Sequence, residues 1–408
     1  MKKKLIICSL ILLTLILFSW SGIWLAHTRI IEGGLLSLKN KAAKEGVTLE
    51  YGKLDFTMIS SPLHLKTQIN SIRLYNKSHN VSYELNIEGF LLDSDLLNKK
   101  LSIILLGNPT SKDIMVDKIN EGLYAFEKPP VVKCLLNTSF NSLSDFNFNK
   151  WYSMERIEEI SVEEVYYTYS TKEGDRYLPF TKAGPISILL KEKTAMKDMQ
   201  ADLEFKFLNH IYITKPNLNE SEEMQKVYKM IEEGGANDVT FKIHVSNDNN
   251  EKLSPADDSS KDEKNFVNIN VENFHIRNNN YDITVDGDVL KAPDSKIPYF
   301  ALNLSIKGFD KMISIYTDVI EATVGNQAKE KAIHDKEIVK NYSKAISKIL
   351  KDISLSTEKD KLVITLFHKK PEILIANVSF IELMARLQEQ VHIMENKSGI
   401  AKKEVVPW

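Results

Sequence analysis

The chain has 408 residues, of which 43% are hydrophobic and 26% are charged, and its formal net charge is −2. A near-neutral chain without a basic block beyond Lys4 lacks the electrostatic footprint of nucleic-acid-binding proteins, so we expect no nucleic-acid partner. The two cysteines are Cys8, in an apolar N-terminal segment, and Cys134, so no intramolecular disulfide framework is expected.

The N-terminal segment has the properties of a membrane anchor. From Leu5 to Ala26 there are 22 residues without a charge, and a helix of that length reaches roughly 33 Å, enough for a bilayer core of roughly 30 Å. Three lysines precede it, and Trp20 and Trp24 lie one turn apart near its far end, where amphipathic rings favour the membrane interface. Residues 1–28 are therefore predicted to form a cytoplasmic Lys tip and a transmembrane anchor.

A cleaved secretory signal is the alternative interpretation of this segment. Ser19-Trp20-Ser21 offers the small-x-small pattern that signal peptidase recognises. The apolar run continues beyond it, however, whereas a typical signal core has about 7 to 15 residues. We therefore favour a retained signal-anchor of a single-pass protein in the bacterial inner membrane, with its N-terminus in the cytoplasm and its bulk in the periplasm.

Residues 29–46 predict a juxtamembrane helix. Four apolar residues recur at helical spacing, and Gly46 is expected to end the helix. The four are Ile31, Leu35, Leu38 and Ala42.

Alternation of apolar and polar residues dominates the remaining periplasmic body, residues 47–408. A period of two runs through Val81–Glu88, and it recurs around Phe205, Phe241, Ile283 and Leu302. One-sided alternation is typical of antiparallel sheets. The predicted fold is α+β and mainly β: a transmembrane helix, then a long curved antiparallel sheet, meander-like and with bulges, and a few C-terminal amphipathic helices.

Two changes of phase predict bulges. The apolar positions switch from odd to even numbers at Asn70-Ser71, and a second switch occurs at Asn273. A slip of one residue turns every following side chain to the opposite face, so each switch marks a candidate bulge. Bulges at these positions would bend the sheet.

Helical spacing occurs in four later stretches, at about 219–233, 309–324, 327–352 and 379–394. Their apolar sides are expected to pack on the sheet. The stretch at about 247–264 instead holds six acidic and three basic residues with almost nothing apolar, so we expect it to be a disordered loop.

The sequence carries no recognisable catalytic signature. Ser356-Thr-Glu-Lys359 fits S-x-x-K but lacks the companion motifs of that enzyme class, and Asp286-x-Asp288 has no glycine-rich phosphate loop beside it. We attribute the first match to chance and interpret the two aspartates as solvated turn residues. The sequence thus predicts no catalytic residue, no metal site and no cofactor, and we expect that the protein is not an enzyme.

Several stretches carry a resemblance to a known family. They are the Trp20/Trp24 anchor with the amphipathic helix after it, Gly46-Val-Thr-Leu-Glu-Tyr51, Ser60-Ser-Pro-Leu-His-Leu65, and Asp286-Gly-Asp-Val-Leu290 leading to Ala301–Phe309. In these the chain resembles the uncharacterised bacterial family "domain of unknown function 2125", distantly similar to AsmA-like membrane-anchored periplasmic proteins. The resemblance implies one membrane span and a β-rich body whose curved sheets hold or pass lipids in apolar grooves.

The residues themselves suggest a compatible function. Many strands with one apolar face and few helices to cover them either close on themselves or leave an apolar trough. We take Phe205, Phe241, Ile283 and Leu302 as a candidate apolar groove for membrane lipids or another apolar ligand, in envelope maintenance. The alternative is a scaffold with a fully packed sheet that binds other envelope proteins, and an anchored hydrolase is the least favoured hypothesis.

Overall fold

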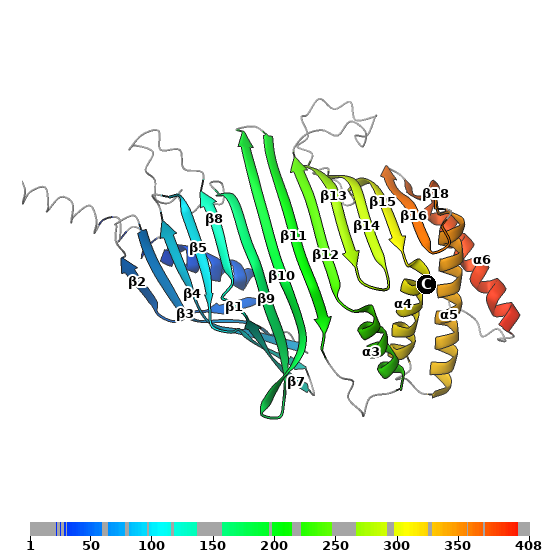
Figure 1. The fold of residues 1–408 in the computed structure, drawn as a ribbon, viewed down its shortest axis with the longest axis horizontal. Coiled ribbons are helices and arrows are strands. Elements are labelled where there is room, and N and C mark those ends of the chain that lie inside the picture. Colours follow the sequence, from blue (N-terminus) through cyan, green and yellow to red (C-terminus); the bar gives the residue numbers. More distant parts are fainter. Residues whose placement is uncertain are drawn as a thin grey trace, which may run out of the picture. The chain divides into compact units, whose positions relative to one another are not determined.

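The computed structural model confirms a mainly β, antiparallel protein with a few helices (Figure 1). It describes residues 22, 25, 28–29, 31–58, 64–77, 81–95, 98–115, 118–136, 157–195, 198–213, 222–246, 267–291, 298–324, 329–356, 358–369 and 372–398. The chain divides into two compact units, Met1–Lys193 and Thr194–Trp408. The predicted body therefore contains parts of both units.

No helix among the residues described is long and apolar enough to cross a membrane. The predicted anchor residues Leu5, Trp20, Trp24 and Ala26 lie outside the described residues, as does the stretch 247–264.

A helix over residues 31–44 packs on the sheet of the first unit. Its Leu35 and Ala42 contact a cluster built around the buried side chains of Leu49, Ile69 and Ile72. Gly46 follows with φ +75°, the left-handed conformation that ends many helices. Leu38, expected on the buried stripe, is instead 54% exposed, because Leu35 and Ala42 make the contacts with this cluster.

The strands of the first unit, which we call the first sheet, combine long strands with pairs of short ones placed end to end; the long strands β3 and β4 are neighbours, and the short pairs are neighbours through β5–β8 and β6–β7 pairing. β1 and β2 both pair with β3, β5 and β6 both pair with β4, and β7 and β8 both pair with β9, which also pairs with β10. The strands are β1 (Val47–Glu50), β2 (Leu54–Met58), β3 (His64–Lys77), β4 (Val81–Asp95), β5 (Lys100–Leu106), β6 (Thr110–Met115), β7 (Lys118–Phe126), β8 (Val131–Leu136), β9 (Ile157–Glu173) and β10 (Arg176–Ala195).

Backbone irregularities line up across this sheet. The break between β5 and β6 lies beside the break between β7 and β8, since the Leu105 amide in β5 donates to the Pro130 carbonyl at 3.0 Å and the Tyr124 amide in β7 donates to the Pro109 carbonyl at 2.9 Å. The break between β7 and β8 also contacts β9, because the Glu127 amide donates to the Tyr166 carbonyl at 3.2 Å. Close to this contact, Glu164 of β9 has φ +36°. Because each irregularity interrupts the regular pleat, together they allow the sheet to bend along one line.

The predicted irregularity at Asn70-Ser71 takes an unexpected form. Ser71 has φ +51°, and the buried positions change from Leu65, Thr67 and Ile69 to Ile72, so the phase change is confirmed. The pairing with β4 nevertheless continues without an extra residue, from Asn70 opposite Gly89 to Ile72 opposite Ile87. A left-handed residue, rather than an inserted one, thus changes the face.

The second unit is a meander in which each strand pairs antiparallel with the next. Its strands are β11 (Asp198–Tyr212), β12 (Asn237–Ser246), β13 (Val267–Arg277), β14 (Asp282–Lys291), β15 (Tyr299–Lys307), β16 (Lys361–Lys369), β17 (Glu372–Ile375) and β18 (Val378–Ser379). The helices α3 (Glu222–Gly234), α4 (Phe309–Val324), α5 (Lys329–Asp352) and α6 (Phe380–Ser398) lie close to the ranges that helical spacing predicts.

The second predicted bulge is present in β13. Lys242 pairs with Asn273 whereas Ile243 pairs with Val271, which leaves Glu272 as the extra residue. The position predicted from the phase change is therefore correct to within one residue.

The core of the second unit forms where α4 meets the sheet. Phe309 and Leu362, each 1% exposed, pack with Ile306, Met312 and Ile364. The residue before Phe309, Gly308, has φ +74° and lets the chain turn from β15 directly into α4. Asp360 fixes this turn, because its carbonyl accepts the Gly308 amide at 2.9 Å and its carboxylate accepts the Asp310 amide at 3.0 Å.

Candidate functional site

The second sheet has one strongly apolar face, which we define by three rows of residues running across the strands. Residues that lie directly opposite each other in antiparallel strands share a face. The central row is Phe205, Phe241, Phe274, Val285, Leu304 and Ile364; the flanking rows are Phe207, Val239, Ile276, Ile283, Ile306 and Leu362, and Leu203, Ile243, Val271, Leu302, Leu366 and Ile375. We call these three rows the apolar face.

Helices seal the part of the apolar face that lies on β14–β16. Phe309 and Met312 of α4 are buried against Ile306, Leu362 and Ile364. Other residues of the face pack around this cluster, together with Leu350 of α5; they are Ile283, Leu304, Leu366 and Ile375. This part is an ordinary sheet–helix core.

The part on β11–β13 has a different environment. The rings of Phe205 and Phe241 stack at 5.0 Å between centroids, and Phe207 lies 6.5 Å from Phe205. All three are half-buried, and none belongs to the core clusters of the described residues. In Figure 1 the helices of the second unit, α3 to α6, gather at the lower ends of its strands and beside β16–β18, and none of these four helices overlaps the upper parts of β11–β13. We call this part the open apolar face.

The structure brings together two of the four predicted groove residues. Phe205 and Phe241 are directly paired on the open apolar face. Ile283 instead packs on the helix-covered cluster, and Leu302 lies in the neighbouring row opposite Gly287. Sequence reasoning did not place Phe274, which pairs with Phe241, among the groove residues, because it lies two residues beyond the bulged Glu272, where the alternation has changed phase.

Much of the opposite face of the second sheet is polar and its side chains pair with one another, but it also carries a small apolar cluster of Leu290, Tyr299, Ala301 and Phe367. His244 contacts Asp202 at 2.6 Å and His275 contacts Asp282 at 2.7 Å, each across neighbouring strands. Arg277 forms an ion pair with Asp238 at 3.1 Å. Such cross-strand pairs of opposite charge stabilise a solvated face.

Asp286 and Asp288 also have ordinary polar partners. The Asn303 amide donates to Asp286 at 2.9 Å, and the Asn270 amide donates to Asp288 at 2.8 Å. Within the described ranges, no group of three or more His, Cys, Asp or Glu side chains could hold a metal ion.

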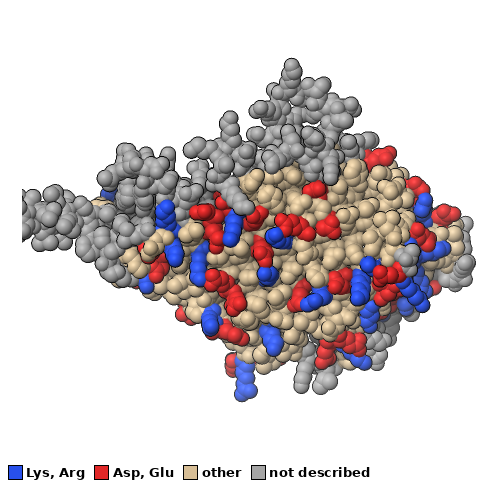
Figure 2. Space-filling model, turned by 45° about the horizontal axis from the view of Figure 1, so that its top comes forward, with Lys and Arg blue, Asp and Glu red and all other residues tan. Residues whose placement is uncertain are grey.

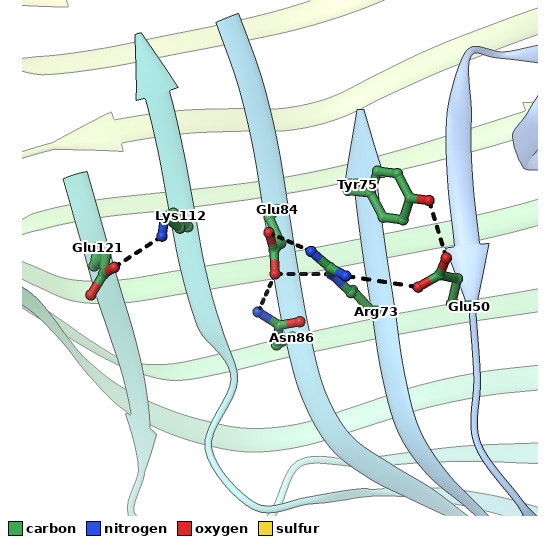
Figure 3. A network of polar contacts seen from close by, with 7 residues as sticks. All are labelled: Glu50, Arg73, Tyr75, Glu84, Asn86, Lys112 and Glu121. Atoms are coloured by element: carbon green, nitrogen blue, oxygen red, sulfur yellow. Dashed lines mark hydrogen bonds and ion pairs between the residues drawn. The ribbon is translucent and has the colours of Figure 1, made fainter. Parts of the chain in front are cut away.

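The polar face of the first sheet carries a ladder of alternating charges, which Figure 3 shows in close-up. Arg73 donates from Nε to Glu84 at 3.0 Å, and its guanidinium lies 3.9 Å from Glu50. Farther along, Lys112 and Lys172 contact Glu121 at 3.3 Å and 2.6 Å. The ladder thus alternates in sign from strand to strand.

Hydrogen bonds in this ladder lower the pKa of two of its carboxyl groups. The bond from Arg73 lowers the pKa of Glu84, with a further contribution from Asn86. The bonds from Lys172 and then Lys112 lower the pKa of Glu121. Acidic and basic residues also intermix among the described residues on the face shown in Figure 2, so this face has no large patch of one sign that would attract a strongly charged partner.

The other face of the first sheet holds an aromatic cluster. The rings of Tyr124 and Tyr169 lie 4.7 Å apart, and Tyr167 lies 6.1 Å from Tyr124. Burial is the main cause that raises the pKa of Tyr83 and of Tyr124. A side chain at Gly122 would meet the Tyr169 ring, with 2.3 Å between the added Cβ and the ring, so this glycine leaves room for the ring.

Ser356, the serine of the S-x-x-K match, has a structural role in a turn. Ser356 Oγ accepts a hydrogen bond from the Glu358 amide at 3.2 Å, and the Ser356 amide donates to Ser354 at 3.1 Å. Buried His368 is likewise held by the Pro298 carbonyl at 2.6 Å and stacks on Tyr299. These contacts explain both side chains as parts of the fold.

Comparison with known protein families finds no family model that matches the chain, and comparison with curated proteins finds no match either.

Proposed function

We propose that this protein is held at the bacterial inner membrane by its N-terminal segment, extends into the periplasm, and binds lipid or another apolar ligand on the open apolar face without catalysing a reaction. The proposal rests on the row formed by the paired residues Phe205, Phe241 and Phe274. Helices of the second unit cover this row where it continues on β14–β16, but not on the upper parts of β11–β13. The family resemblance points the same way.

The physical chemistry of this surface suits an acyl chain. Exposed apolar area on a protein is energetically unfavourable unless it meets an apolar partner. Each methylene taken from water contributes about 0.8 kcal/mol, so burying about eight methylenes on the open apolar face would contribute about 6 kcal/mol. Ordering the chain and losing its free translation offset part of this, which leaves a weak and reversible interaction. Reversible binding fits a protein that holds lipid temporarily.

Native mass spectrometry of the full-length chain in lipid nanodiscs tests the proposal. We expect phospholipid to remain bound after release from the nanodisc, and we expect Phe241→Thr to lose it, because threonine keeps a residue suited to a strand and removes the ring. The control is Tyr177→Thr, which removes a ring that is 39% exposed in the first unit. A chain that carries no lipid, or a Phe241→Thr chain that retains as much as the control, would contradict the proposal.

A scaffold function is the second candidate, and one observation favours it. At the start of α6 the side chains of Ile381 and Phe380 are 80% and 49% exposed. Large exposed apolar side chains often mark protein contacts. A lipid-free chain that co-purifies with a stoichiometric envelope protein, and that loses this partner on Ile381→Asp, would favour the scaffold.

A further inference from the structure

A groove of about 580 Å³ runs between α4 and α5. Two ion pairs line it, one between Lys351 and Asp310 and the other between Lys340 and Glu321, with 3.6 Å between nitrogen and oxygen in the second. The volume lies within the range of about 300 to 1,000 Å³ that is usual for small-molecule sites. Between the two ion pairs the groove is open to a ligand.

The α5 side of the groove presents positive charge. Lys340, Lys344 and Lys348 are four residues apart, so they lie on one side of the helix, where like charges repel; together with Lys351 they outnumber Asp352, the acidic residue of α5 that lines the groove. In the described part of the chain no acidic partner neutralises Lys344 or Lys348, although Lys348 donates to Gln390 at 3.1 Å. The hydroxyls of Ser314 and Ser347 line the same stretch. Two ammonium groups beside hydroxyl donors suit a phosphate ester.

The α4 side presents negative charge. Asp318 lines the groove, and so does Glu321. The Glu321 Oε1 atom is buried and has no hydrogen-bond partner among the described residues, although Oε2 faces Lys340. A buried carboxylate oxygen without a donor is costly, so this end of the groove suits a ligand that brings a positively charged donor.

We propose that the α4–α5 groove binds a zwitterionic phosphoethanolamine group, with the phosphate between Lys344 and Lys348 and the ammonium between Asp318 and Glu321. An anion alone would meet the two carboxylates, and a cation alone would meet the lysines, whereas a zwitterion complements both. Ile313, which lines the groove and packs on the core cluster, offers an apolar contact for the carbon atoms between the charges.

The same group occurs as a soluble phosphate ester and as a lipid head group. If the ligand is a lipid head group, this inference rests on the proposed function and extends it, because the head group and the acyl chain would then bind to the same unit. The soluble source would make the groove a separate site for a polar metabolite.

The test measures binding to the full-length chain in nanodiscs of phosphatidylcholine. Isothermal titration with O-phosphoethanolamine, inorganic phosphate and ethanolamine compares the zwitterion with its two halves. Flotation with vesicles of phosphatidylethanolamine or phosphatidylglycerol, each in phosphatidylcholine, then identifies the source. The variants are Lys344→Gln with Lys348→Gln together, and Asp318→Asn alone; Lys359→Gln, at an exposed turn outside the groove, is the control for lost charge.

We expect O-phosphoethanolamine to bind at least about tenfold more tightly than phosphate or ethanolamine, and each groove variant to weaken it by about tenfold or more while the control does not. Flotation with phosphatidylethanolamine vesicles but not with phosphatidylglycerol vesicles would show that the ligand is a lipid head group. Binding of O-phosphoethanolamine in the titration without such selective flotation would show that the ligand is the soluble ester. Equal binding of phosphate and the zwitterion, unchanged binding by the groove variants, or no binding would overturn the groove assignment. Lipid binding on the open apolar face is tested separately. If the groove assignment fails but the chain still retains phospholipid and loses it on Phe241→Thr, the proposed function stands without the groove.

Discussion

Phe309 joins the sheet of the second unit to its helices, and its truncation gives the sharpest test of the fold. The side chain is 1% exposed and lies at the centre of the cluster with Ile306, Met312, Leu362 and Ile364. A phenylalanine buries roughly 150 Å² or more, which at about 25 cal/mol per Å² corresponds to about 4 kcal/mol. Measured Phe→Ala substitutions in cores cost about 3 to 5 kcal/mol, in agreement with this value.

Hydrogen exchange read by mass spectrometry is the appropriate assay for Phe309→Ala, because a chain with two units need not unfold in one step. In the exchange regime governed by local opening, a loss of about 3 to 5 kcal/mol speeds exchange of β15, β16 and α4 amides by about 10²- to 10³-fold or more. Phe380→Ala is the matched control, since this ring is 49% exposed. Equal exchange in the two variants would refute the packing of α4 on the sheet.

Three further predictions concern the first unit. Gly89→Ala should destabilise it by about 1 to 3 kcal/mol in urea unfolding, since the added Cβ would lie 2.3 Å from the Ile69 carbonyl oxygen, whereas Gly33→Ala, with open space around it, should be neutral or stabilising. The pKa of Glu121 is lowered in the folded state, so the contribution of this carboxylate to stability is present above its ordinary pKa of 4.5 and is lost as the pH falls below that value. Glu121→Gln should therefore make Tm fall less steeply as the pH is lowered through this acidic range. An unchanged dependence of Tm on pH would contradict the charge ladder. Cys134 is buried and its burial raises the pKa of the thiol, so peptide mapping after iodoacetamide at pH 8 should show alkylation in urea and none in the native chain; rapid native labelling would contradict its burial.

Local sequence patterns were enough to predict the longer alternating strands, such as those around Phe205 and Phe241, the late helices and the positions of both irregularities, but not the short strands β6 and β7. Alternation around Phe205 and Phe241 reports which residues share a face, because side chains in a strand point alternately to the two sides. The phase change at Ser71 reports an irregularity for the same reason. It could not distinguish an inserted residue from a left-handed one, since both turn the following side chains to the other face.

The cover on the apolar face could not be predicted, because it depends on contacts between elements far apart in the sequence. Ile283 and Phe241 show the same alternation, yet helix packing surrounds Ile283 and leaves Phe241 outside the core clusters of the described residues. The α4–α5 groove was missed for a related reason. Lys344 and Asp318 each resemble an ordinary charged residue on an amphipathic helix, and their shared groove appears only once the two helices lie side by side.

Photocrosslinking with a phospholipid that carries a diazirine on its acyl chain tests the central claim most directly. Full-length protein in nanodiscs would be irradiated, digested and mapped by mass spectrometry. The account predicts labelled peptides from β11, β12 and β13 that contain Phe205, Phe241 or Phe274, with little labelling of the helix-covered strands β15 and β16. Labelling confined to the N-terminal 28 residues, or spread evenly over both units, would contradict binding on the open apolar face.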